Sequence, residues 1–281
     1  MKLLFLGTAA GTTTKARNTS ALLLRWSSPR ADSWLFDCGE RTYHYLQLGE
    51  SNIDSISKIF ITHLHADHVL GLLALLFGMS VKKRRKTLMI FGPEGIGEWI
   101  RFNLKATYTT LAFSLEIKEH STNQLIYQEN TKQVYAYEML HRCPSFAYRV
   151  EELAITATKC EKQMDAKEHI SLETSPSKKK IVTIFGDTQP NANELLAAQN
   201  ADLVIHEATF RDDLAELAKK YGHSTAREAA QMAKKAGVKR LLLTHLSSRY
   251  SSRLQREALL QEAREELSNT DLADDFLEFE V

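Results

Sequence analysis

Three histidines and one aspartate fall within six positions of the segment Thr62–His68, which reads THLHADH and follows an apolar, strand-like run. Imidazole nitrogens and carboxylate oxygens are ligands that zinc and similar ions take in proteins. His63 and His65 alternate, so an extended segment places both on one face, whereas Asp67 and His68 fall where a helix begins and point elsewhere. A lone histidine is more often a structural residue, but four potential ligands in six positions favour a site for one or two metal ions.

Three more candidate ligands, His141, Asp187 and His245, each stand directly after an apolar, strand-like segment. Taken singly, each is more often a polar residue whose hydrogen bonds are satisfied nearby. The ends of neighbouring strands converge on one edge of a sheet, however, so residues far apart in sequence can meet there. The repeated placement predicts that all three join the turn at residues 62–68.

The composition fits a single domain over residues 1–281, because 43% of the 281 residues are hydrophobic, enough for a substantial core. A formal charge of +1 gives no global bias toward nucleic acid or an anionic membrane, so a polyanion must be met by local features. Three widely spaced cysteines argue against a disulfide framework and for a reducing compartment. Because no apolar stretch reaches the length of a membrane span, we expect a cytoplasmic protein with no membrane partner.

The order of the elements predicts mixed sheets sandwiched by helices, since early strands follow one another and later ones alternate with helices. A helix apolar on every side, and therefore buried, is expected at Val69–Phe77, and a capping box of Thr225 and Glu228 at a later helix. The predicted strands are Leu3–Leu6, Ala21–Trp26, Trp34–Phe36, Ile59–Ile61, Leu88–Phe91, Val134–Leu140, Ile181–Phe185, Leu203–Ile205 and Leu241–Leu243. The other predicted helices are Glu94–Leu104, Asn193–Ala198, Asp212–Tyr221, Ala226–Ala236 and Leu254–Leu267.

Three polar segments stand apart from these elements. The basic run Lys82–Lys86 is expected on a surface loop, where a solvated face and a track for phosphates are equally favoured interpretations. Residues 160–180 contain Pro176 and three consecutive lysines, and are expected to form a polar surface excursion of low order. The acidic residues Asp274 and Asp275 are expected to be merely solvated.

Together these motifs make the chain similar to the metallo-β-lactamase superfamily and, within it, to the ribonuclease Z family of tRNA 3′-processing enzymes. The HxHxDH run is typical of the whole superfamily, whereas its combination with HEAT, HST and THLSSRY is specific to the ribonuclease Z group. The resemblance spans nearly the whole chain. The matching stretches are LGTAAGTTTKARNTS (Leu6–Ser20), FDCGERT (Phe36–Thr42), THLHADHVLGL (Thr62–Leu72), FGPEG (Phe91–Gly95), GDT (Gly186–Thr188), HEATF (His206–Phe210), HSTAREAA (His223–Ala230) and LLLTHLSSRY (Leu241–Tyr250).

The resemblance implies a four-layer αββα fold with two divalent ions at one edge, Zn²⁺ being favoured and Mn²⁺ or Fe²⁺ the alternatives. Glu207 and His223 match the HEAT and HST elements, a carboxylate that holds an imidazole near the leaving group. Helix capping beside Ser224 is the structural alternative for His223. The ligands implied are His63, His65 and His141 for the first ion, Asp67, His68 and His245 for the second, and Asp187 as the bridge. The histidines expected to be structural are His44, His120, His169 and His206.

The activity implied is that of a metal-dependent endoribonuclease that cleaves the 3′ trailer from tRNA precursors. A hydroxide made available by the metals attacks the phosphodiester. Asp67 accepts the proton of the water, and His223 protonates the departing 3′-oxygen of the tRNA body. The trailer then leaves with a 5′-phosphate. The partners implied are precursor tRNA or another RNA, and a second copy of the chain in a homodimer.

The chain departs from the family pattern in the segment that usually grips tRNA. Ribonuclease Z enzymes commonly carry a flexible arm rich in Gly and Pro between the third-motif histidine and the bridging aspartate. Here 46 positions separate His141 from Asp187, and no glycine lies between Arg142 and Phe185, so residues 160–180 replace or lack the arm. The alternative function is a dinuclear-metal phosphodiesterase acting on short oligonucleotides or cyclic nucleotides. A third hypothesis is a non-catalytic RNA-binding module.

Overall fold

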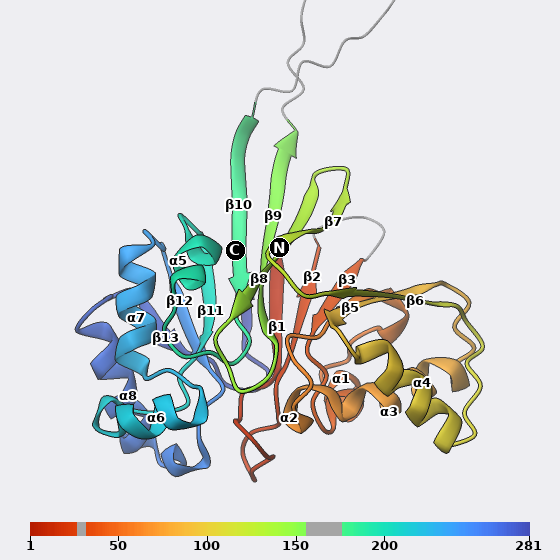
Figure 1. The fold of residues 1–281 in the computed structure, drawn as a ribbon, viewed down its shortest axis with the longest axis horizontal. Helices are drawn as coiled ribbons and strands as arrows, with labels where there is room; N and C mark the ends of the chain where they lie inside the picture. The colour runs from red at the N-terminus through yellow and green to blue at the C-terminus, as the bar shows by residue number, and fades with distance from the viewer. Residues whose placement is uncertain (27–31, 156–175) are drawn as a thin grey trace, which may run out of the picture.

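Two sheets packed face to face form the centre of the computed structural model, which describes residues 1–26, 32–155 and 176–281 (Figure 1). Within these ranges each sheet has seven strands, in the orders β14-β1-β2-β3-β4-β5-β6 and β13-β12-β11-β10-β9-β8-β7. The first sheet contains β1 (Lys2–Gly7), β2 (Ala21–Arg25), β3 (Ser33–Phe36), β4 (Ile56–Phe60), β5 (Leu88–Pro93), β6 (Leu115–His120) and β14 (Glu278–Glu280). The second contains β7 (Gln124–Glu129), β8 (Lys132–Met139), β9 (Ser145–Ile155), β10 (Pro176–Ile184), β11 (Leu203–Glu207), β12 (Leu241–Thr244) and β13 (Thr270–Leu272).

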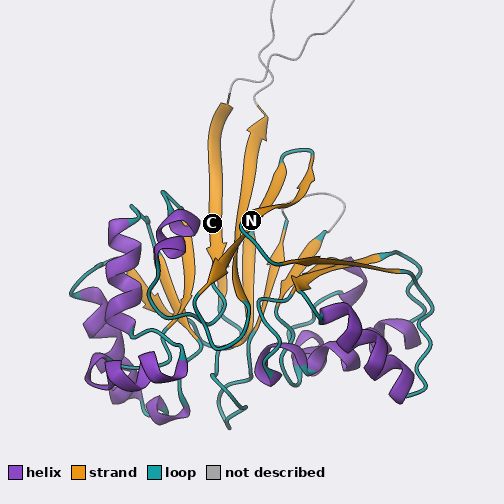
Figure 2. Ribbon diagram, in the orientation of Figure 1, coloured by secondary structure: helices purple, strands orange, loops and turns teal. Residues whose placement is uncertain are grey.

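Helices cover the outer face of each sheet, which confirms the expected four-layer αββα fold (Figure 2). Apolar side chains fill the space beneath each helical layer as well as the space between the sheets. The helices on the first sheet are α1 (Thr42–Leu48), α2 (Ala66–Val69), α3 (Gly71–Val81) and α4 (Ile96–Ala106). Those on the second are α5 (Ala192–Ala198), α6 (Ala215–Tyr221), α7 (Ala226–Lys235) and α8 (Arg253–Arg264).

Large aromatic side chains hold the two sheets together. Trp34, Phe60 and Tyr148 are fully buried between them. The ring of Phe60 stacks on those of Phe36 and Phe91, with centroids 4.9 and 4.8 Å away. Truncating such a ring to alanine typically costs about 3–5 kcal/mol of stability. This core fixes the position of one sheet against the other, and both sheets contribute residues to the site described below.

Strand direction brings the candidate site residues to one edge of the sandwich. β3, β4 and β5 run parallel, as do β10, β11 and β12, so the carboxyl ends within each set lie together. The turn at residues 62–68 follows β4, Asp187 follows β10, Glu207 ends β11 and His245 follows β12. β8 has the direction of β10, because both are antiparallel to β9, and it therefore delivers His141 to this edge as well.

The predicted strands and helices are all found, with shifted ends, and the capping box of Thr225 and Glu228 is confirmed at α7. One prediction was too strong. The apolar segment Val69–Phe77 does form helix, over α2 and α3, but Phe77 and Val81 are 55% and 64% exposed, so α3 is not buried on every side. Elements that the sequence did not predict include α1, β6 and β7.

The polar segment predicted at residues 160–180 is only partly described, because residues 160–175 lie outside the described ranges. Its last residues, Pro176–Lys180, form the first half of β10 rather than a surface excursion. Their backbone pairs with β9 in an antiparallel register from Ile155 to Glu152, which gives the segment hydrogen-bond partners that a loop would lack. Proline is tolerated there because it is the first residue of the strand.

The basic run Lys82–Lys86 does not act as one surface. Arg84 is 4% exposed, and its guanidinium donates to the backbone carbonyl oxygens of Lys86 and Thr87 at 2.8 and 3.2 Å. The other four side chains are exposed. Arg84 therefore stabilises the loop between α3 and β5. For the four exposed cations, contact with solvent and binding of phosphates both stay open as interpretations.

The acidic residues Asp274 and Asp275 are not merely solvated. Asp275 accepts hydrogen bonds from the Thr8 hydroxyl at 2.7 Å and from the backbone N–H of Asn18 at 2.6 Å, while Asp274 pairs with the buried guanidinium of Arg17. These bonds tie the chain near its C-terminus to the loop after β1. Through these contacts the two residues fix a loop that borders the candidate site.

Within the described ranges, no helix is both long and apolar enough to cross a membrane. Two of the three cysteines, Cys38 and Cys143, are free thiols, and Cys160 lies outside the described ranges.

Candidate metal centre

A buried aspartate holds the turn at residues 62–68 in shape. Asp37, directly after β3, accepts the backbone N–H of Thr62 at 2.8 Å and the Thr62 hydroxyl at 2.9 Å. Its Oδ2 also lies 2.8 Å from Nδ1 of His68. One carboxylate thus joins the start and the end of the turn, which is why the strand-to-helix connection presents its side chains in a fixed arrangement.

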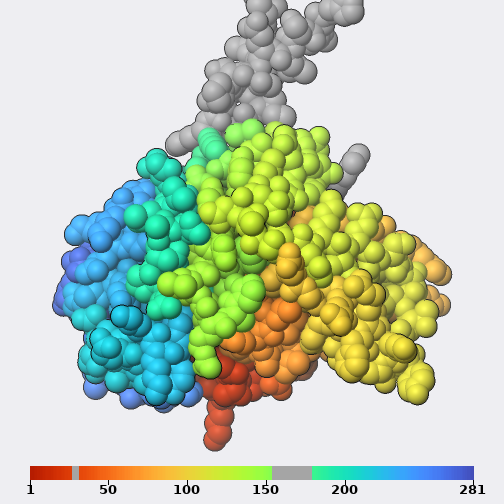
Figure 3. All heavy atoms as spheres, viewed as in Figure 1, coloured from red at the N-terminus to blue at the C-terminus, as the bar shows by residue number. Residues whose placement is uncertain are grey.

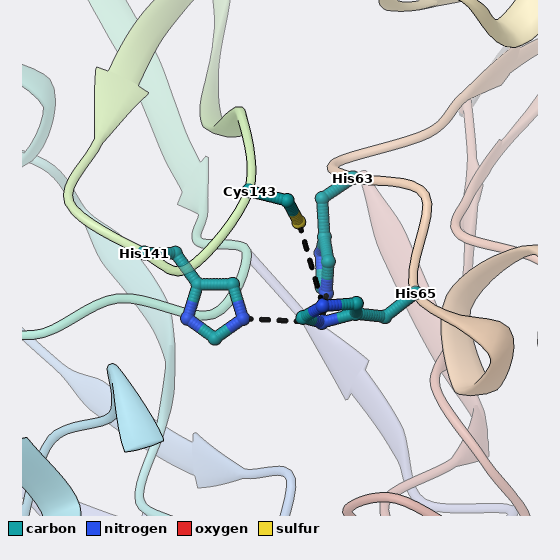
Figure 4. A group of neighbouring side chains, drawn as sticks. All are labelled: His63, His65, His141 and Cys143. Atoms are coloured by element: carbon teal, nitrogen blue, oxygen red, sulfur yellow. Dashed lines mark hydrogen bonds between the residues drawn. The ribbon is translucent and has the colours of Figure 1, made fainter. Parts of the chain in front are cut away.

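Three histidines of the candidate first site converge (Figure 4). Nδ1 of His65 lies 3.1 Å from Nε2 of His63 and 3.1 Å from Nε2 of His141. His63 and His65 come from the turn after β4, and His141 from the loop after β8 in the other sheet. The structure therefore brings together the three residues that the sequence suggested for one ion.

A second group of three residues lies beside the first. Nε2 of His68 is 3.2 Å from Nε2 of His245, and Oδ2 of Asp67 is 3.2 Å from the same His245 nitrogen. Asp67 also accepts the backbone N–H of Gly11 at 2.7 Å, from the loop that Asp275 anchors. His245 has a left-handed backbone with φ 55°, an uncommon conformation for a residue other than glycine and one found at functional sites.

Asp187 lies between the two groups. Its Oδ2 is 3.7 Å from Nε2 of His63, and its Oδ1 is 3.4 Å from Nε2 of both His68 and His245. The two oxygens of one carboxylate therefore face different groups, as a bridging ligand requires. All seven candidate ligands predicted from the sequence meet at this edge.

The ring nitrogens that face away from the centre have partners of their own. A neutral imidazole carries one N–H and one lone pair, so an outward N–H that is bonded leaves the inward lone pair free for a metal. The outward contacts are His63 Nδ1 to Thr62 Oγ1 (3.0 Å), His65 Nε2 to Cys143 Sγ (3.6 Å), His68 Nδ1 to Asp37 Oδ2 (2.8 Å), His141 Nδ1 to the Gly222 carbonyl oxygen (2.6 Å) and His245 Nδ1 to Thr209 Oγ1 (2.9 Å).

The electrostatics of the centre suit a cation. Burial alone raises the pKa of the Asp187 carboxyl, but His245, His68 and His63 outweigh burial and hold that pKa well below its usual range. Burial, and then the proximity of His68, lowers the pKa of His63 well below its ordinary value, so this ring is neutral. Burial alone lowers the pKa of His68, but Asp187, Asp37 and Asp67 outweigh burial and raise that pKa well above its ordinary value. A bound cation takes the place of such a proton, because metal binding releases protons from its ligands.

The donor set therefore fits divalent metal ions. Nitrogen lone pairs held about 3 Å apart repel one another unless a proton or a cation lies between them. Five imidazoles and two carboxylates are borderline to hard ligands, which suit zinc, manganese or iron rather than a purely thiolate-seeking ion.

A carboxylate and an imidazole lie next to the candidate metal ligands. Oε1 of Glu207, which is 1% exposed, lies 3.0 Å from Nδ1 of His223. Burial lowers the pKa of His223, but the charge and hydrogen bond of Glu207 outweigh burial and raise that pKa to about 9. Capping of α7 does not account for His223, because Thr225 is the N-cap residue and the Ser224 hydroxyl donates to the Thr188 carbonyl oxygen.

An open cleft of about 370 Å³ exposes the cluster to solvent. Five of the candidate ligands, His65, Asp67, His141, Asp187 and His245, line it together with His223. The remaining lining residues in the described ranges are Ala10, Gly11, Arg142, Thr209, Phe210, Tyr221 and Arg249.

Known proteins resemble this chain in sequence and in fold over nearly their full length. A ribonuclease Z from Listeria welshimeri is 38% identical over 309 aligned residues, which cover 100% of this chain and 99% of that protein. The crystal structure of the short form of human tRNase Z is 30% identical, with a TM-score of 0.79, and the match covers 100% of this chain and 99% of that one. The chain belongs to the ribonuclease Z family.

The same comparisons extend to the fold and to a second family. The metallo-β-lactamase fold protein YhfI from Bacillus subtilis is 21% identical with a TM-score of 0.74, covers 100% of this chain and 99% of that one, and so shares the architecture. The family model described as anti-Pycsar protein Apyc1 matches residues 1–265, so the chain belongs to that family too. Ribonuclease Z relatives, the fold and the clustered His and Asp side chains together make this protein a metal-dependent hydrolase.

Sequence reasoning missed several residues that this ribonuclease Z family member places around the centre. Asp37 and Thr209 stand within the matching stretches FDCGERT and HEATF, yet only their positions in the structure reveal that they hold ligands. Cys143 was considered only as a marker of the redox compartment, but its sulfur lies beside His65 and it groups with the first three histidines (Figure 4). Its position two residues after His141 was the available signal.

Proposed function

We propose that this protein is an endoribonuclease that removes the 3′ trailer from tRNA precursors. The observation that supports this most strongly is the position of His223, held by Glu207 at the edge of a cluster of seven candidate metal ligands. Such an arrangement offers a cation site for a phosphoryl group and a proton donor for its leaving oxygen at the same place.

Two divalent ions, most readily Zn²⁺ and alternatively Mn²⁺ or Fe²⁺, are part of this proposal. His63, His65 and His141 would hold one, Asp67, His68 and His245 the other, and Asp187 would contact both. When bound, such a pair supplies a water of lowered pKa and offsets negative charge that grows on the phosphoryl oxygens.

Asp67 takes the proton of the attacking water in this mechanism. The backbone N–H of Gly11 donates to its Oδ2 and fixes the carboxylate, and the buried surroundings leave it 9% exposed. On the other side of the phosphorus, His223 donates a proton from Nε2, because Glu207 occupies Nδ1. The departing group is the 3′-oxygen of the tRNA body, and the trailer keeps the 5′-phosphate.

A second candidate function is a phosphodiesterase that acts on short oligonucleotides or cyclic nucleotides. It uses the same ligands and is favoured by the match of residues 1–265 to a family that is not described as ribonuclease Z. The short interval from His141 to Asp187, which has no glycine between Arg142 and Phe185, also favours it.

One experiment separates the two candidates. Purified protein is given a precursor tRNA with a 3′ trailer, a 2′,3′- or 3′,5′-cyclic nucleotide and a small chromogenic diester, and the RNA products are mapped. Cleavage directly after the tRNA body supports the first proposal. Turnover of cyclic nucleotide or diester without RNA cleavage would replace it with the second, and no hydrolysis by metal-loaded protein would favour a binding module.

We also propose that residues 1–281 act as one catalytic domain that assembles as a homodimer in a reducing, cytoplasmic setting. Both sheets contribute ligands, so neither could form the centre alone. Sedimentation at several protein concentrations tests the dimer.

A further inference from the structure

The cleft has one wall that neither the metal cluster nor the His223–Glu207 pair explains. Two arginine and aromatic pairs line it: the Arg142 guanidinium lies 6.0 Å from the ring centroid of Tyr221, and that of Arg249 lies 5.6 Å from the ring of Phe210. The two pairs differ in what they can offer a ligand. Phe210 is 4% exposed, so its ring faces are already covered, whereas Tyr221 is 40% exposed.

The exposed pair is open to a ligand on both of its side chains. Among the residues that the structure describes, Arg142 has no carboxylate partner and no side-chain hydrogen bond. The neighbouring Lys220 places its ammonium 5.8 Å from the Tyr221 ring, so a second cation borders the same aromatic surface. A ring that is 40% exposed and has cations about 6 Å from its centroid is a combination that binds a nucleobase together with its phosphate.

This pair is fixed relative to the reacting groups. Arg142 follows the candidate ligand His141, and Tyr221 is two residues before His223. The intervening Gly222 accepts the His141 Nδ1–H on its carbonyl oxygen at 2.6 Å. Gly222 has φ +80°, and a Cβ there would lie 2.8 Å from His141 Nδ1, so only glycine allows the two segments to meet this closely.

We propose that Tyr221 and Arg142 form a nucleotide subsite on the leaving-group side of the scissile phosphate. The inference rests on the proposed function, because the leaving-group side is identified by His223, the residue proposed to protonate the leaving oxygen. Tyr221 stacks on the base of the nucleotide whose 3′-oxygen departs, and Arg142 contacts the phosphate on the 5′ side of that nucleotide. Stacking on the base without hydrogen bonds to its edge makes the subsite tolerant of sequence.

A cycle that combines a protein change with a substrate change tests the stacking. The variants are Tyr221→Ala and Tyr221→Phe, and the substrates are a precursor RNA and the same RNA with an abasic residue just before the scissile bond. With wild type, loss of the base lowers kcat/KM at least about fivefold, the lower end of what one stacked base contributes. Tyr221→Ala shows a similar loss on the intact RNA and little further loss on the abasic RNA, while Tyr221→Phe behaves as wild type.

One control variant and two contrary outcomes test the proposed subsite. Tyr108, 96% exposed and two residues after the end of α4, provides the matched variant Tyr108→Ala, which is expected to behave as wild type. The chain around α4 (yellow) lies on the opposite side of the view from the chain around α6 (cyan) (Figure 3). Thermal unfolding confirms that Tyr221→Ala is folded. If the losses from the variant and from the abasic residue multiply, or if wild type is indifferent to the base, the subsite is wrong. For Arg142→Ala we expect a weaker dependence of KM on salt, and Arg142→Lys restores part of it.

Failure of the proposed function is distinguishable from failure of the subsite. If wild type cleaves no RNA, the same cycle is measured as binding of a nucleoside 3′-monophosphate and of ribose 3-phosphate to each variant by calorimetry. A preference for the nucleotide that disappears in Tyr221→Ala supports the subsite for any nucleotide substrate. Equal affinities for the two probes in wild type would reject it.

Discussion

Glu207 Oε1 lies 3.0 Å from Nδ1 of His223 and also accepts the backbone N–H of Ser224 at 3.0 Å. One buried carboxylate therefore fixes both the imidazole and the chain segment that carries it. A second oxygen of Glu207 accepts the Thr209 hydroxyl at 2.7 Å, and that hydroxyl is the outward partner of His245. The candidate acid and a candidate ligand thus share a single anchor.

Replacing His223 by alanine is expected to lower kcat about 10²- to 10⁴-fold on an RNA phosphodiester, the usual contribution of a positioned general acid. The loss should shrink to a few-fold on a diester with a 4-nitrophenolate leaving group, because that group departs without protonation. Steady-state kinetics on both substrates measure the contrast. Equal losses on the two substrates would mean that His223 binds substrate or metal and does not protonate the leaving oxygen.

Replacing Asp187 by asparagine is expected to lower the bound metal from two ions toward one or none. The amide keeps the shape but removes the charge that faces both groups of ligands. Metal content after dialysis against a weak chelator, and the midpoint of a zinc titration, measure the change. Asp213→Asn, at an exposed side chain of the second sheet's helical layer, is the matched control and should retain two ions. Full occupancy in Asp187→Asn would remove the bridge from the proposal.

Replacing Cys143 by alanine is expected to weaken metal binding at the first group of histidines about 10-fold, the lower end for loss of a partner that orients a metal ligand. The sulfur lies 3.6 Å from His65 Nε2, and we expect it to orient the ring rather than to coordinate the ion. Cys143→Ser keeps an acceptor and should bind nearly as wild type. Cobalt titration provides the readout, and a sulfur-to-cobalt charge-transfer band in wild type would show direct coordination instead.

The buried pair of His206 and Glu194 makes the stability depend on pH. Nε2 of His206 lies 3.2 Å from Oε1 of Glu194. Burial alone lowers the pKa of His206, but the hydrogen bond and charge of Glu194 outweigh burial and raise it. Because the pKa of His206 is higher in the folded than in the unfolded protein, its protonation stabilises the fold. This contribution is fully present below the unfolded-state pKa of about 6.5 and is lost as the pH rises through the folded-state pKa.

Urea unfolding of metal-loaded protein from neutral to alkaline pH measures this contribution. Wild type should lose stability across the range, whereas Glu194→Gln should lose much less. Glutamine retains the capping interaction with Asn191 at the start of α5, so the variant isolates the charge. Parallel pH profiles for the two proteins would mean that His206 is neutral in the folded state.

Much of the fold and of the candidate site could be predicted from the sequence, for a definable physical reason. His141, Asp187 and His245 follow apolar strands, and strand ends of one direction must meet at an edge, so their convergence with the 62–68 turn followed from the pattern. α1 and β7 lacked a comparable apolar period. β6 lies at the edge of its sheet, and its alternation of apolar and charged residues covers only Leu115 to Lys118, which is too short to be distinctive.

Contacts between distant segments could not be predicted from the sequence. Asp275 bonds Thr8 and Asn18 across almost the full chain length, and no local pattern distinguishes it from a solvated acid. Arg84 likewise turns inward because backbone carbonyl oxygens of its own loop accept its N–H groups. Tyr221 lies near Arg142 and His141 because Gly222 allows the end of α6 to contact the loop after β8, and this loop also carries Cys143. The sequence gives no sign of this contact.

The strands β9 and β10 reach well beyond the rest of their sheet, and their outer tips lie opposite the edge that gathers the histidines (Figure 1). Insertions or deletions between those tips can accumulate without moving a single atom that touches a phosphate. Natural selection can thus lengthen, trim or rebuild that distant end while the reaction chemistry is inherited intact.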